Sequence, residues 1–156
     1  MVVDIKVKQM SGCTVASLIH YGPHGPDMFR NEFNQLVRWA SKNKLRTGRW
    51  IMRWIDDPGK KPANRIRSDA CLEIKGKAKP EGKIRIKKFP RQTVLSVTFD
   101  PEKVSTRLVY SGIYGWIRYS AFEATDSPAR EVYIGNPWKN PRAWANAEIQ
   151  VPVKKR

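Results

Sequence analysis

The sequence predicts an α+β fold, in which two tandem strand–helix–strand–strand modules form one antiparallel sheet with two main helices and a central ligand cleft. Three observations predict it: short segments of alternating apolar and polar residues, two stretches with helical periodicity, and motifs that recur 79 residues apart. The 156 residues suit one domain. A chain of this size buries roughly 68–70% of its unfolded surface, so it needs no disulfide or metal to fold.

The repeat is visible in several pairs of motifs that follow one another in the same order. The pairs separated by 79 residues are 5–10 and 84–89, Thr14-Val15 and Thr93-Val94, 54–58 and 133–137, and Pro62 and Pro141. Trp39 and Trp116 are also equivalent, at a spacing of 77. We therefore predict a single domain over residues 1–156, with repeat one at about 1–78 and repeat two at about 83–156.

In the first repeat, β-branched alternation predicts strands at about 2–8 and 14–21. A helix is expected to begin near Gly25 or Pro26-Asp27, because proline suits the first helical turn. Its apolar positions at helical spacing are Phe29, Phe33, Leu36, Val37 and Ala40. A third strand over 50–55 is expected to close in a turn at Asp57-Pro58-Gly59, and a fourth contains 71–74.

The second repeat is expected to follow the same plan. Strands are predicted at 83–89, 93–99, 131–134 and 147–153. A helix is predicted over about 102–119, with an apolar stripe made by Tyr110, Ile113, Tyr114 and Ile117.

The charge of the chain is strongly positive but evenly distributed. Thirty Lys and Arg residues face fourteen Asp and Glu residues, for a formal net charge of +16. Such a balance attracts nucleic acids, anionic membranes or acidic partners. Residues 1–78 and 79–156 each carry 15 basic and 7 acidic residues. The pattern favours a uniformly basic surface, and leaves weak nonspecific nucleic-acid binding as a further partner class.

Several classes of protein are not expected. No apolar run is long enough for a transmembrane helix, and the N-terminal residues lack the apolar core of a signal peptide. Cys13 and Cys71 do not make a disulfide framework, which favours the cytoplasm. Cys13, His20, His24 and Cys71 do not match zinc spacings, and no phosphate loop or dinucleotide glycine pattern occurs, so no metal or cofactor is expected.

Motifs spread over the whole chain carry a resemblance to a known family. They are His20-Tyr21-Gly22-Pro23, the helix with Phe33, Leu36 and Trp39, Ile55-Asp56-Asp57-Pro58, the second helix with Trp116, Arg130-Glu131-Val132-Tyr133, Asn136-Pro137, and 149–153. In this order they resemble the GyrI-like small-molecule-binding domain, which also supplies effector-binding domains of AraC-type and MerR-type multidrug regulators. The resemblance implies a pseudo-twofold module with a ligand cleft where the halves meet, and leaves no room for a DNA-reading module.

Two positions depart from the repeat or from the family pattern. Asp100-Pro101 stands where the first repeat has Gly22-Pro23, and Met52 is the first-repeat counterpart of Glu131. The second difference is what the resemblance leads us to expect if only one half supplies an acidic group.

The resemblance implies that Glu131 lies at the floor of the cleft and faces cationic, aromatic ligands. A partly buried carboxylate ringed by aromatic groups recovers its desolvation cost when a cation arrives, and aromatic faces add cation–π attraction. Tyr133 lies two residues on, at strand spacing and so on the same face. The alternative for Glu131 is a surface carboxylate paired with Arg130.

Further aromatic residues are proposed as cleft walls. They are Trp39, Trp54, Tyr114, Trp116 and Tyr133. Ordinary core packing is the alternative for each of them. Trp138 and Trp144 follow Pro137 and are expected to form a rim or lid.

Three functions are compatible with these residues. The first is a stand-alone binding domain for hydrophobic or aromatic small molecules, cationic ones included, without membrane association. The second is a hydrolase that opens strained cyclopropane rings, as some family members do; Glu131 would activate water while Tyr133 or Tyr114 stabilises the developing anion. The third is a protein that interacts with gyrase or with nucleic acid.

Overall fold

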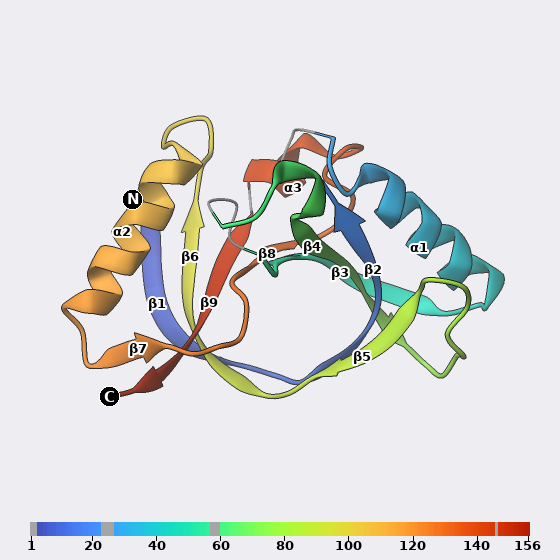
Figure 1. Ribbon diagram of the computed structural model, residues 1–156, viewed down its shortest axis with the longest axis horizontal. Helices are drawn as coiled ribbons and strands as arrows, with labels where there is room; N and C mark the ends of the chain where they lie inside the picture. The colour runs from blue at the N-terminus through green and yellow to red at the C-terminus, as the bar shows by residue number, and fades with distance from the viewer. Residues whose placement is uncertain (1–2, 23–26, 57–59, 146) are drawn as a thin grey trace. The chain divides into compact units, whose positions relative to one another are not determined.

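The computed structural model describes residues 3–22, 27–56, 60–145 and 147–156 (Figure 1). The expected α+β class is confirmed, with antiparallel strand pairing and two long helices. The strands and helices divide into two compact units: an N-terminal unit, 12–90, and a C-terminal unit, 3–11 together with 91–156. Across the described residues, every helix is too short or too polar to cross a membrane.

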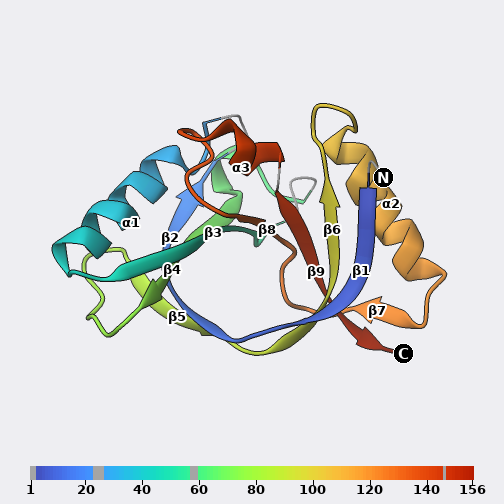
Figure 2. The ribbon, with the colours of Figure 1, turned by 180° about the vertical axis from the view of Figure 1, so that it is seen from behind.

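The N-terminal unit is a four-stranded antiparallel sheet with one long helix. Its elements are β2 (Cys13–Tyr21), α1 (Arg30–Lys42), β3 (Arg46–Trp54), a 3-10 turn (Ala63–Arg65), β4 (Arg67–Lys75) and β5 (Arg85–Phe89). The strand order is β3-β4-β2-β5. Figures 1 and 2 show α1 lying along β2, β3 and β4, against which it packs. Phe33 stacks on Trp50 of β3 with 4.6 Å between ring centroids, which anchors the helix to the sheet.

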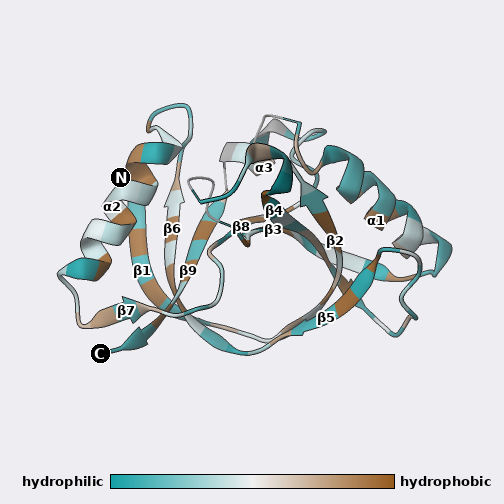
Figure 3. Cartoon of the chain, viewed as in Figure 1, coloured by the Kyte–Doolittle hydropathy of each residue, from teal (hydrophilic) through white to brown (hydrophobic). Residues whose placement is uncertain are grey.

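The C-terminal unit repeats this arrangement and adds two short elements. Its elements are β1 (Val3–Met10), β6 (Gln92–Phe99), α2 (Thr106–Arg118), β7 (Phe122–Ala124), β8 (Arg130–Tyr133), α3 (Pro141–Ala145) and β9 (Glu148–Lys155). The order is β1-β6-β9-β8, and β7 also pairs with β9. Figure 3 shows apolar and polar bands alternating along β1 and β9. The core of this unit lies between α2 and the odd-numbered residues of β6 and β9, such as Leu95, Val97, Ile149 and Val151.

Both long helices begin later than the sequence predicts. The start of α1 near Pro26-Asp27 is wrong: Phe29 has a left-handed φ of 73°, and the helix begins at Arg30. The start of α2 near Glu102 is also wrong, because Asp100 closes a turn over 100–104 and the Ser105 side chain accepts a hydrogen bond from the Leu108 amide. Pro23, Gly25, Pro26 and the predicted turn at 57–59 lie outside the described residues.

The predicted stripe on the second helix is wrong at one position. Tyr114 is 50% exposed, and Val109 joins Ile113 and Ile117 on the buried side of α2. A helix advances 100° per residue, so Tyr114 is turned well away from the direction that Val109, Ile113 and Ile117 share. Two elements, β7 and α3, were not predicted, because they are shorter than a periodic pattern can reveal.

The first strand of each predicted repeat pairs with the second strand of the other. β1 lies against β6, and β5 lies against β2. Lys8 on β1 contacts Glu148 at 2.7 Å, while Lys87 on β5 contacts Asp69 at 2.9 Å. Both the lysines and the acids are 79 positions apart, so the two ion pairs are equivalent under the predicted repeat. The repeat boundaries themselves stay a prediction.

Candidate functional site

The candidate site is built on the short strand β8. Glu131 is paired in register with Ile149 of β9, so its side chain lies on the face that carries the α2 core. Tyr133 follows at strand spacing on the same face. The chain then turns away at Gly135, whose φ of 93° favours glycine.

The Glu131 carboxylate is partly buried, and it has neither a hydrogen-bond nor an ion-pair partner among the described residues. Burial raises the pKa of this carboxyl from 4.5 to about 7, because the charged form loses hydration that nothing in the described chain replaces. The site therefore holds an acid that changes its charge near neutral pH.

Tyr133, two residues further along β8 than Glu131, packs against an aromatic side chain of α3. Tyr133 is 3% exposed, and its ring meets Trp144 of α3 edge-to-face at 5.3 Å. Trp144 in turn meets Trp138 edge-to-face at 5.8 Å. Asn136 orders the connecting turn, since its side chain accepts a hydrogen bond from the Trp138 amide at 2.9 Å. Burial, together with the nearby Glu131 charge, raises the pKa of the Tyr133 hydroxyl.

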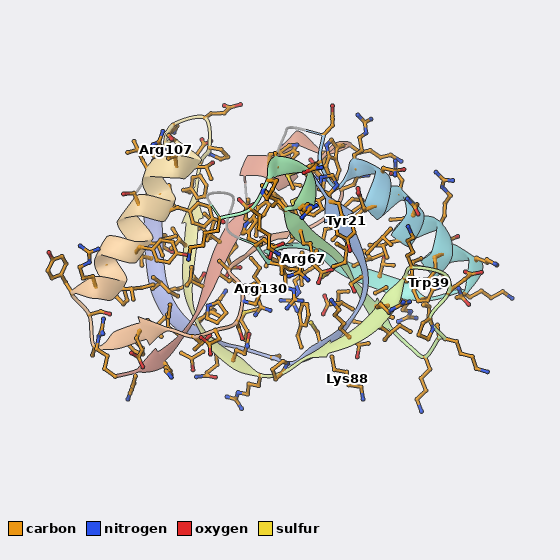
Figure 4. All side chains as sticks on the ribbon, viewed as in Figure 1. Tyr21, Trp39, Arg67, Lys88, Arg107 and Arg130 are labelled. Carbon is orange, nitrogen blue, oxygen red and sulfur yellow. The ribbon has the colours of Figure 1, made fainter. Side chains whose placement is uncertain are left out.

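The residues on either side of Glu131 point to the opposite face of the sheet. Arg130 is buried, and its Nε donates to Gln150 Oε1 at 2.9 Å (Figure 4). Gln150 also donates to Glu148, which accepts from Lys8 and Ser96 as well. Burial acts to raise the pKa of Glu148, but these donors outweigh it, and the pKa is lowered. Glu131 and Glu148, on the neighbouring strands β8 and β9, therefore have opposite electrostatic environments.

The other predicted wall residues lie in varied surroundings. Trp39 is buried on α1, and Trp54 lies 5.7 Å from the Phe29 ring at the end of β3. On α2, Tyr114 is half-exposed, whereas Trp116 is 37% exposed and stacks on Phe122 at 6.4 Å. The ligand-binding roles of these four residues stay predictions. Trp144 was expected only at a rim, and its contact with Tyr133 makes it a closer neighbour of the site.

The sequence of the chain matches a known protein family over nearly its whole length. The model of the GyrI-like small-molecule-binding domain matches residues 3–154. The chain belongs to this family.

One curated relative and three solved structures are similar to this chain. The DNA gyrase inhibitor of Escherichia coli K12 is 24% identical over 137 residues, which cover 85% of this chain and 87% of the relative. The C-terminal domain of EcmrR has a TM-score of 0.75 and 20% identity, and each chain is covered completely. In the EcmrR–DNA complex, the chain spans 59% of EcmrR, with a TM-score of 0.76. SAV2435 bound to tetraphenylphosphonium has a TM-score of 0.54 and 11% identity, with 97% and 94% coverage. The chain thus shares its fold with the C-terminal domain of EcmrR.

Proposed function

We propose that this GyrI-like domain binds hydrophobic, aromatic cations, and that Glu131 supplies the counter-charge. The observation that carries the proposal is the partly buried Glu131 carboxylate, which has no hydrogen-bond or ion-pair partner in the part of the chain that is described. A bound cation would offset the cost of charging this group, and Tyr133 with Trp144 would add apolar contact and cation–π attraction. The tetraphenylphosphonium bound to SAV2435 is a ligand of this chemical class.

The net charge of +16 repels cations at long range. Screening reduces this repulsion beyond about 8 Å at physiological ionic strength, whereas a partly buried carboxylate in contact with the ligand is screened much less. Local attraction at Glu131 therefore decides the binding.

Further ligand contacts are proposed for the aromatic residues Trp39, Trp54, Tyr114 and Trp116. The compartment is proposed to be the reduced cytoplasm, because two cysteines do not form a disulfide framework.

A second candidate function is hydrolysis of strained-ring compounds. A carboxyl with a pKa of about 7 is suited to act as a general acid or base at neutral pH, and this observation on Glu131 supports the hydrolase. Product formation that disappears in Glu131→Gln while binding persists would favour an enzyme. Interaction with gyrase or nucleic acid, the third function expected from the sequence, would need a surface away from Glu131.

The binding proposal is tested by calorimetric titration of tetraphenylphosphonium and of neutral triphenylphosphine oxide at pH 8. In Glu131→Gln we expect the affinity for the cation to fall at least about tenfold, because truncating a partly buried charge pair costs more than 1.4 kcal/mol. Affinity for the neutral compound should stay within about threefold, a difference of about 0.7 kcal/mol.

Glu123→Gln is the matched control, since the Glu123 side chain on β7 is 44% exposed and is paired with Lys154. Its affinities should equal those of the wild type. An equal loss of affinity for both compounds in Glu131→Gln would point to a changed shape of the binding site. Absence of binding by either compound to the folded wild type would refute the proposal.

A further inference from the structure

Seven basic side chains gather at one end of the N-terminal unit. They come from the end of α1 and the turn after it, from the facing ends of β3 and β4, and from the segment between β4 and β5. We call them the α1-end surface: Lys42, Lys44, Arg46, Lys75, Lys77, Lys79 and Lys83, all of them exposed. The one acid in segments 42–46 and 75–83 is Glu81, and it is already paired with Lys42 at 3.0 Å. The charge is therefore concentrated here, although its distribution along the sequence is even.

Contacts within the unit bring the two segments together. Arg46 and Lys75 are register partners on β3 and β4. A Cβ at Gly76 would lie only 3.2 Å from Leu45 Cδ2, so the turn after α1 packs on the start of the β4–β5 segment. A shallow hollow between them is lined by Trp39, Lys42, Asn43, Lys79, Pro80 and Glu81. Figures 1 and 2 show both segments beside the last turn of α1, where Figure 4 labels Trp39.

The fold also favours positive charge at this end. Lys42 lies in the last turn of α1, where the helix dipole stabilises cations. From the last residue of β4 into the segment that follows it, Lys75, Lys77 and Lys79 alternate with the small residues Gly76, Ala78 and Pro80. These lysines make no ion pair with another described residue. An extended ligand with regularly spaced negative charges would therefore meet several cations at once.

We propose that the α1-end surface binds the phosphate backbone of duplex DNA. None of the exposed large apolar side chains in the described chain belongs to segments 42–46 or 75–83. A membrane surface would call for apolar anchors there, and single-stranded nucleic acid for exposed aromatic rings on which bases stack. A surface of cations alone matches the duplex backbone, whose binding is electrostatic and independent of sequence.

The test compares two variants of equal net charge by fluorescence anisotropy with a labelled 20-base-pair duplex between 50 and 200 mM NaCl. The surface variant changes Lys75, Lys77, Lys79 and Lys83 to Gln. The control changes four exposed lysines of the C-terminal unit in the same way: Lys6, Lys103, Lys139 and Lys155. Each variant lowers the formal net charge from +16 to +12.

We expect the surface variant to reduce the slope of log K against log[NaCl] by about 3 to 4, since each phosphate contact contributes about 0.9. The control should keep the wild-type slope. An equal reduction of the slope in both variants would mean that the net charge of the whole chain attracts the DNA, and would overturn the proposal. So would the absence of DNA binding in the wild type, or binding to vesicles with anionic lipids that the surface variant loses while DNA binding is unchanged.

Discussion

Replacing Glu131 by glutamine is expected to stabilise the free protein by about 3 kcal/mol at pH 8, because each unit of pKa shift corresponds to 1.36 kcal/mol. The pKa of Glu131 is raised from 4.5 to about 7 in the folded state, so the folded protein holds this proton more tightly than the unfolded chain. The contribution to stability is complete below pH 4.5 and is lost as the pH rises through about 7. Glutamine cannot ionise and does not suffer this loss.

The measurement is urea unfolding of both proteins at pH 4 and pH 8. The stability gain of Glu131→Gln should appear at pH 8 and vanish at pH 4. Glu148→Gln provides a control of opposite sign, because the lowered pKa of Glu148 stabilises the folded state above pH 4.5 and that contribution is lost in acid. A Glu131→Gln protein that is less stable than the wild type at pH 8 would contradict the account of this site.

Removing the Asp69 carboxylate is expected to destabilise the N-terminal unit by about 2 to 3 kcal/mol. Asp69 is fully buried and accepts hydrogen bonds from Arg53 at 2.9 Å and from Lys87 at 2.9 Å. Asp69→Ala leaves two cations without their acceptor, and breaking a fully buried pair costs about 3–5 kcal/mol. The Arg53 and Lys87 side chains are 19% and 34% exposed, so water recovers part of this cost.

The free energy of unfolding in urea measures this effect. Glu123→Ala is the comparison, since its pair with Lys154 is exposed and worth about 0–1 kcal/mol. If Asp69→Ala does not fold, Asp69→Asn takes its place, because asparagine keeps the shape of the side chain and part of the hydrogen bonding. The loss of unfolding free energy in Asp69→Asn should be larger than in Glu123→Ala and smaller than the loss expected for Asp69→Ala. An Asp69→Ala protein within about 0.5 kcal/mol of the wild type would show that the cluster does not hold β3, β4 and β5 together.

Most of the fold could be predicted because its periodicities are strong. The α1 core positions Phe33 and Leu36 follow directly from burial on one face of the helix. Helix starts could not be predicted, because the left-handed Phe29 and the Ser105 cap depend on local backbone geometry. The pairing of β1 with β6 and of β5 with β2 could not be predicted either, since a repeat pattern does not say with which copy a strand pairs.

The candidate site could be predicted only in part. Glu131 and Tyr133 share a face because strand spacing requires it, and the structure places them so. The edge-to-face contact between Tyr133 and Trp144 depends on α3, which is too short to show a pattern. The Asp69 cluster was missed because its members are 16 and 18 residues apart, although Lys8, Lys87, Asp69 and Glu148 obey the repeat spacing.

The most direct test is the ionisation of Glu131 itself, followed by NMR of ¹³C-labelled glutamate side chains. The Glu131→Gln spectrum identifies the resonance by its disappearance. We predict a midpoint of about 7 in the unliganded protein, and a lower midpoint when tetraphenylphosphonium is bound, because a cation favours the charged carboxylate. A midpoint near the ordinary glutamate value of 4.5 in the unliganded protein, unchanged by the cation, would contradict the account.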